Sequence, residues 1–240
     1  MWRAEIDGLR LSFHLAGIND QNFLMRDEQT GTYWQQISGI GVSGPLAGRR
    51  LTLVSSDELT FRQWRAENPR GTVLDDVPGL AGEYARPDWD VRMRKTPTVI
   101  SYPGQGLMAR DLMLGIDAFG AARAFLVEEI RGARLVNDRA GAEPVLLVTG
   151  PDGQSIRAFR RRIPGVAAVL EFYRIEDAGS DPLAALFMDG DTGSRWNFKG
   201  CAVSGKLQGT CLEHVESIQD YWFDWCRYHP HTTVFRLVKR

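Results

Sequence analysis

Cysteine and histidine, the side chains best suited to redox and soft-metal chemistry, are concentrated near the end of the 240-residue chain. All three cysteines and three of the four histidines lie within residues 201–231. Thiolate and imidazole are ligands that zinc and copper bind well, so Cys201, Cys211, Cys226 and His229 form a candidate zinc or copper site. Their spacing matches no recognised ligand pattern, and we favour buried cysteines that act as small hydrophobic side chains. We therefore predict no cofactor.

Two of these cysteines have a third possible role. If Lys206-Leu207 centres a hairpin, Cys201 and Cys211 face each other across two strands, with Cβ atoms about 4.5–5.5 Å apart, and could form a disulfide. Catalysis by cysteine is not favoured, because Cys211 and His214 would point to opposite sides of a strand.

A second polar group lies between residues 13 and 36. It combines amide side chains with a histidine and follows a strand-like pattern, and Trp34 stands close by in the sequence. Polar side chains on a loop beside an aromatic ring are typical of a site for a small polar ligand. The ordinary alternative is that the amides cap loop backbone. The candidate ligand-binding residues are His14, Asn19, Gln21, Asn22, Asp27, Trp34 and Gln35.

Asp27 has a counterpart in Asp189, because the chain matches itself at a fixed offset. Residues 24–74 align with residues 186–235, first at an offset of 162 and then of 161. We interpret the match as a tandem duplication of a β-rich unit, with the copies packed as a pseudo-two-fold pair. Two matched aspartates could meet at an interface as an acid–base pair. Hydrogen bonding to the adjoining Thr-Gly turn is the simpler role.

The elements that must position these side chains can be predicted within each copy. Ser56 and Ser217 are suited to cap helices that start with acidic residues, and Pro69 and Pro230 would end those helices. Residues 72–74 and 233–235 then read as strands. Apolar runs at 112–116 and 144–148 indicate buried strands, with a short helix predicted over 121–131.

The expected fold is therefore mainly β (α+β), with a few short helices. We divide the chain into a first repeat at 1–74, an irregular Pro-containing connector at 75–111, and a longer second repeat at 112–240.

The composition excludes some partners. With 29 basic and 30 acidic residues the net charge is −1, so broad attraction to nucleic acid is not expected. No apolar stretch has the length of a membrane span. The N-terminus lacks a signal sequence, which favours the cytoplasm. If an upstream segment has been removed, a periplasmic or membrane-tethered protein is expected.

The strings Asp-x-x-Thr-Gly-x-x-Trp, Gly-x-x-Val-Ser-Gly-x-Leu-x-Gly-x-x-Leu and Trp-x-x-x-x-Pro-x-x-Thr-Val resemble the bacterial domain-of-unknown-function family DUF3179. The resemblance covers nearly the whole chain and implies no established reaction. Many relatives carry an Asn-Trp-His-Glu stretch and a Cys-Pro-Leu-Cys stretch that look like a redox or metal site. Here the corresponding stretches are residues 127–131 and 147–153, and neither contains histidine or cysteine.

Three functions remain open. We favour a non-catalytic binding or assembly module for a polar ligand or protein partner, because the sequence contains no recognisable catalytic motif. The first alternative is an enzyme with a site between the repeats, using His14, Asp27 and the Asn/Gln loop. The second is a metal or redox protein that uses the Cys/His group of the second repeat.

Overall fold

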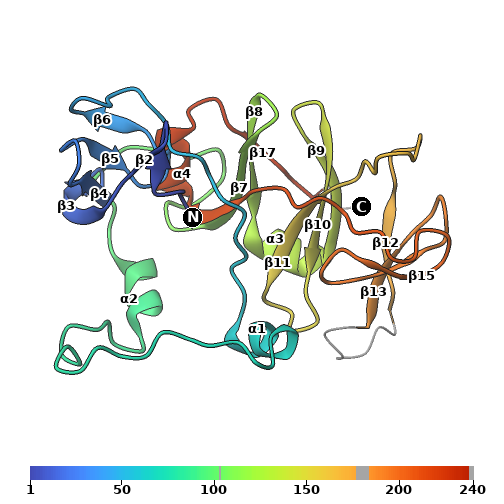
Figure 1. Ribbon diagram of the computed structural model, residues 1–240. Helices are drawn as coiled ribbons and strands as arrows, with labels where there is room; N and C mark the ends of the chain where they lie inside the picture. The colour runs from blue at the N-terminus through green and yellow to red at the C-terminus, as the bar shows by residue number, and fades with distance from the viewer. Residues whose placement is uncertain (103, 177–183, 238–240) are drawn as a thin grey trace.

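The computed structural model describes residues 1–102, 104–176 and 184–237 of the chain. These residues form five sheets and four short helices (Figure 1), which confirms the prediction of a mainly β fold. Residues 103, 177–183 and 238–240, which belong to the predicted connector and second repeat, lie outside the described residues. None of the described helices is long and apolar enough to cross a membrane.

Two four-stranded antiparallel sheets lie towards opposite ends of the molecule (Figure 1) and have the same strand order. The first, which we call the N-terminal unit, adjoins the hairpin of β1 (Glu5–Ile6) and β2 (Leu9–Arg10). Its strands are β3 (Phe13–Asn19), β4 (Asn22–Asp27), β5 (Tyr33–Gln35) and β6 (Gly41–Ser43). The second, the C-terminal unit, consists of β12 (Phe172–Arg174), β13 (Ala185–Asp189), β14 (Arg195–Asn197) and β15 (Ala202–Ser204).

The same buried hydrogen-bond group occurs in both units. In the N-terminal unit, Asp27 accepts hydrogen bonds from the Thr30 backbone N–H at 2.5 Å, the Thr30 hydroxyl at 2.9 Å and Trp34 Nε1 at 2.8 Å. Asp189 accepts the matching bonds from Thr192 at 2.5 and 2.9 Å and from Trp196 at 2.9 Å. Both aspartates therefore have the simpler of their two predicted roles and fix the Thr-Gly turn.

Two central sheets lie between these units. One has the order β16-β7-β8-β17 and the other the order β11-β10-β9. Their strands are β7 (Leu112–Ala118), β8 (Ala121–Leu126), β9 (Leu135–Ala140), β10 (Glu143–Thr149), β11 (Ile156–Arg160), β16 (Ile218–Tyr221) and β17 (Thr233–Val234). The runs predicted as buried strands, 112–116 and 144–148, are β7 and β10.

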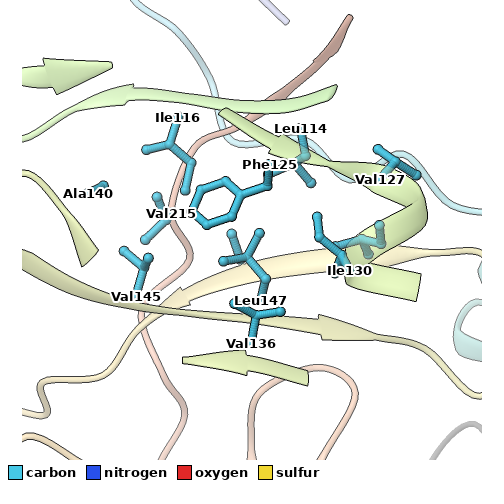
Figure 2. Close-up of a cluster of buried hydrophobic side chains, with 12 residues drawn as sticks. Leu114, Ile116, Phe125, Val127, Ile130, Val136, Ala140, Val145, Leu147 and Val215 are labelled. Atoms are coloured by element: carbon cyan, nitrogen blue, oxygen red, sulfur yellow. The ribbon is translucent and has the colours of Figure 1, made fainter. Parts of the chain in front are cut away.

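The main core fills the space between the two central sheets. Phe125 points into the middle of it, with Val145 and Leu147 on one side and Ile116 on the other (Figure 2). β10 is buried on both faces: Leu146 and Val148 belong to a second core beneath the C-terminal unit. Because alternate residues of a strand face opposite ways, one apolar run can serve both cores.

Two of the four short helices, α1 and α4, lie against parts of the chain that are distant in sequence. The helices are α1 (Phe61–Glu67), α2 (Trp89–Lys95), α3 (Val127–Ala133) and α4 (Trp222–Tyr228). α1, from the first third of the chain, lies below the sheet of β9, β10 and β11, whereas α4, near the C-terminus, lies beside the N-terminal unit (Figure 1). α4 is seated closely on β7, because the Trp225 ring occupies the space that a side chain at Gly115 would need.

Five local predictions were wrong. Residues 121–126 form strand β8 rather than helix, because pairing with β7 outweighs the helix propensity of Ala-Ala-Arg-Ala. α1 is capped by Thr60 instead of Ser56, and residues 218–221, which follow Ser217, are a strand. Residues 72–74 are not a strand, although 233–234 are. The connector contains α2.

Candidate binding cleft

The position of α1 depends on its first residue. Thr60 Oγ1 accepts a hydrogen bond from the Gln63 N–H at 3.2 Å, which caps the helix, and donates one to Asp152 Oδ2 at 2.6 Å. The Thr60 N–H also donates to Ser155 Oγ at 3.0 Å. These bonds tie the start of α1 to the loop between β10 and β11.

A buried arginine fixes the other end of α1. Arg157 on β11 donates from Nη1 to Glu67 Oε1 at 2.8 Å and from Nη2 to Glu67 Oε2 at 2.9 Å. Its Nη2 also reaches Asp57 Oδ2 at 2.6 Å. The side chains of Arg157 and Glu67 are only 4% and 2% exposed. Burial alone would raise the pKa of Glu67, but the hydrogen bonds from Arg157 and Gln63 outweigh it and lower that pKa.

A cleft of about 570 Å³ opens between α1 and the C-terminal unit. One wall comes from residues 57–68 and the other from residues 157–214, so the cleft exists because α1 packs against a distant part of the chain. The lining residues are Asp57, Leu59, Trp64, Glu67, Asn68, Arg157, Lys199, Cys201, Cys211, Leu212 and His214. A pocket of about 20 Å³, room for roughly one water, adjoins it and shares Asp57, Arg157 and His214.

Two side chains in the cleft remain available to a ligand. Lys199 is half-buried, and among the described residues no carboxylate lies within 4.0 Å of its ammonium group. His214 Nδ1 lies 3.8 Å from Asp57 Oδ1, and its ring centroid lies 4.7 Å from that of Phe159. Burial lowers the pKa of His214 more than Asp57 raises it. The ring is therefore neutral near pH 7 and can donate or accept a hydrogen bond.

The cleft also contains a disulfide. Cys201 and Cys211 are directly opposite in an antiparallel bridge and are joined covalently, with Cα atoms 4.0 Å apart. The predicted hairpin geometry is thus confirmed. For these two residues the favoured interpretation of small buried hydrophobic side chains is wrong: Cys201 is half-buried and Cys211 is exposed. It holds for Cys226, which is buried among Met113, Trp222 and other side chains of its own cluster.

The four candidate metal ligands are not brought together. Burial raises the pKa of the Cys226 thiol to about 11. The His229 ring is stacked on Trp225, with centroids 3.7 Å apart, and its Nε2 lies 3.5 Å from Asp117 Oδ2. Hydrogen bonds with His229 and Arg50 lower the pKa of Asp117 to about 2. No group of three or more His, Cys, Asp or Glu side chains in the described ranges is placed to hold a metal ion.

The candidate ligand residues of the N-terminal unit are also dispersed. Residues 13–23 form the β3–β4 hairpin instead of a loop, and Asp20 and Gln21 take positive φ values of 50° and 68° at its turn. His14 is exposed on β3, whereas Asp27, Trp34 and Gln35 are buried.

The amides of this hairpin bind other parts of the chain. Asn22 Nδ2 donates to Asp224 Oδ2 on α4, and the Asn19 carbonyl accepts from Tyr228 Oη at 3.4 Å. Gln21 Oε1 accepts from the Val99 N–H at 2.6 Å. The polar segment therefore holds α4 and the connector in place. It lines neither the cleft beside α1 nor the smaller cleft beside the N-terminal unit.

A smaller cleft of about 230 Å³ lies at the matching place beside the N-terminal unit, covered by α4. At the self-match offset of 161, Ile40 and Arg50 correspond to Cys201 and Cys211, and Tyr228 and His229 to Glu67 and Asn68. Its lining residues are Ser38, Ile40, Arg50, Asp117, Ala122, Tyr228, His229, Pro230 and His231.

Sequence reasoning missed the charged residues of the main cleft. Arg157 lies 100 residues from Asp57 and 90 from Glu67, so no local spacing connects them. One signal was present: an arginine inside the apolar strand Ile156–Arg160 needs a buried partner.

Residues 127–131 and 147–153 lie next to each other. Thr149 Oγ1 donates to the Ile130 carbonyl at 3.2 Å, and Arg131 Nε donates to the Gln154 carbonyl at 3.2 Å. Asp152, in the second stretch, holds the cap of α1.

The family of proteins of unknown function DUF3179 matches residues 1–232 of the chain. The chain belongs to this family. Comparison with curated proteins and with solved structures finds no match.

Proposed function

We propose that this member of DUF3179 is a binding protein whose site is the cleft between α1 and the C-terminal unit, and that its ligand is a small molecule with a carboxylate or similar anionic group. The observation that carries the proposal is the half-buried Lys199, which has no described carboxylate within ion-pair distance in a cleft of about 570 Å³. A cation placed in this way can pair with an anionic ligand at modest desolvation cost.

The remaining walls suit such a ligand. Two carboxylates, Asp57 and Glu67, hold Arg157, more than balance its charge and keep the walls rigid, and the charge of Lys199 also lowers the pKa of Glu67. Neutral His214 can orient a polar group, while Trp64, Leu59 and Leu212 offer apolar surface. A few convergent polar groups on an apolar lining are characteristic of small-molecule sites.

Titration with acetate and succinate, followed by amide and indole NMR signals, tests the proposal. Saturable shifts at Lys199, His214 and the Trp64 indole are expected at millimolar concentrations. Lys199→Gln should weaken binding about tenfold or more, since a hydrogen bond to a charged group contributes about 1.5–3 kcal/mol. Lys206→Gln, an exposed lysine of the same unit, is the matched control. The site would be rejected if both variants showed equal shifts, or if no residue of the cleft shifted.

Two further proposals concern the whole chain. The matched hydrogen bonds of Asp27 and Asp189 support an origin by tandem duplication. The Cys201–Cys211 disulfide supports residence in an oxidising compartment such as the periplasm, because cytosolic disulfides are rare. Acid quenching of cells followed by alkylation should find these two cysteines protected, whereas free thiols in the quenched cells would contradict that location.

A further inference from the structure

We propose that the Cys201–Cys211 disulfide is a redox-active group that oxidises dithiol compounds by thiol–disulfide exchange. The first observation is access: Cys211 is exposed, and both cysteines line the open cleft. An attacking thiolate must approach a sulfur directly, so a disulfide at a cleft wall can react where a buried one cannot.

The second observation is that the hairpin does not need the covalent bond. In the N-terminal unit Ile40 and Arg50 form the same antiparallel bridge without cysteines. There the Gly41 N–H donates to Arg49 O and the Leu51 N–H to Gly39 O, both at 2.9 Å.

The C-terminal unit repeats those two bonds around the disulfide. The Ala202 N–H donates to Thr210 O and the Leu212 N–H to Gly200 O, both at 2.8 Å. The backbone thus takes one geometry with and without the disulfide. The reduced protein should therefore keep its fold, as a reversible redox group requires.

The third observation is the charge around the sulfur atoms. Lys199 lines the same cleft, two residues before Cys201, and neutral His214 is available to accept a proton. A nearby cation stabilises a thiolate and so improves it as a leaving group.

The exchange is balanced as follows. One thiolate of the dithiol attacks the Sγ of Cys211, the exposed residue of the pair. The Cys201–Cys211 bond breaks, and Cys201 leaves as a thiolate in the cleft that Lys199 also lines. The second thiolate of the dithiol then attacks its own sulfur in the mixed disulfide and releases Cys211. The dithiol loses two electrons and two protons to become a disulfide, and Cys201 and Cys211 become thiols.

Dithiothreitol is the probe for the test, and Cys226→Ala is the background, because it removes the third, buried thiol. Alkylation and mass spectrometry should count two new thiols per chain within minutes in buffer, with unchanged tryptophan fluorescence. Two further variants in this background keep one thiol each: Cys201→Ser keeps Cys211, and Cys211→Ser keeps Cys201. The Cys211 thiol should form a mixed disulfide with oxidised glutathione several-fold faster than the Cys201 thiol.

The proposal is overturned if thiols appear only at denaturant concentrations that unfold the chain. The role of Lys199 is tested by the pH profile of the reduction rate. Below about pH 8, the range in which stabilisation of a thiolate matters most, dithiothreitol should reduce the disulfide of Lys199→Gln several-fold more slowly than that of Lys206→Gln. Equal rates would overturn that role. Dithiothreitol carries no carboxylate, so a failure of its reduction assay would leave the proposed anion site unaffected.

Discussion

Asp27 stabilises the N-terminal unit through bonds that only an ionised carboxylate can accept fully. Asp27→Ala should lower the free energy of unfolding by about 3 kcal/mol, because it leaves buried Trp34 Nε1 and the Thr30 backbone N–H without their acceptor. The exposed neighbour Glu28 is the control, and Glu28→Ala should change stability by less than about 0.5 kcal/mol. Urea unfolding of the three proteins measures the difference.

The same carboxylate predicts a pH dependence. Burial would raise its pKa, but the bonds from Trp34 and Thr30 prevail, so the folded-state pKa lies below the ordinary 3.8. Its contribution is therefore present above pH 3.8 and lost as the pH falls through the folded-state value. A difference in the free energy of unfolding between the wild type and Asp27→Ala that stays constant down to strongly acid pH would contradict this.

Arg157 holds α1 to the second half of the chain. Arg157→Met should cost about 3–5 kcal/mol of stability, because Glu67 then remains buried without its partner. Arg49 is a suitable control, since both it and its partner Asp7 are exposed, and Arg49→Met should cost less than about 1 kcal/mol. Comparable losses in the two variants, measured by urea unfolding, would contradict a buried network.

At the scale of single elements, the docking of α4 on the N-terminal hairpin should depend on pH. Burial raises the pKa of Asp224 to about 6, although its bond from Asn22 opposes the rise. The folded state therefore favours protonated Asp224. The stability that this protonation contributes is fully present below pH 3.8 and is lost as the pH rises through about 6.

Asp224→Asn, which cannot ionise, should thus gain stability relative to the wild type as the pH is raised from about 4 to 7. Unfolding curves across this range measure the gain, and Asp191→Asn, an exposed acid, should show none. A gain for Asp224→Asn that is the same at every pH would contradict a raised pKa.

Single elements also show what the sequence could reveal. β7 and β10 were predictable, because their apolar runs need no knowledge of the partner strand. β8 was not, because Ala121–Leu126 resembles a helix until β7 pairs with it. The start of α1 was misplaced at Ser56, because threonine caps a helix as serine does and the contact of Thr60 with Asp152 is not local.

At the scale of the whole molecule, the exchange of helices makes the two halves depend on each other. Residues 1–74 lose the partners of α1 when separated, and residues 112–240 lose the hairpin that docks α4. Each piece alone should therefore lack a cooperative unfolding transition, and mixing them should restore one. Circular dichroism and co-purification test this. Cooperative unfolding of both isolated pieces would support the predicted domain boundaries as independent units.

This arrangement explains why the cleft could not be predicted. The self-match of the sequence indicates two similar units but does not state which unit each helix covers. That choice is made by ion pairs such as Arg157–Glu67, 90 residues apart in the sequence. The sequence did identify Cys201 and Cys211 as opposed residues, because a hairpin register is local.

The most direct test of the central claim is the NMR titration of the wild type, Lys199→Gln and Lys206→Gln with succinate. The proposed site predicts saturable shifts at Lys199, His214 and Trp64 in the wild type and Lys206→Gln, weakened about tenfold or more in Lys199→Gln. Indistinguishable titrations of the two lysine variants, or shifts confined to surfaces outside the cleft, would contradict it.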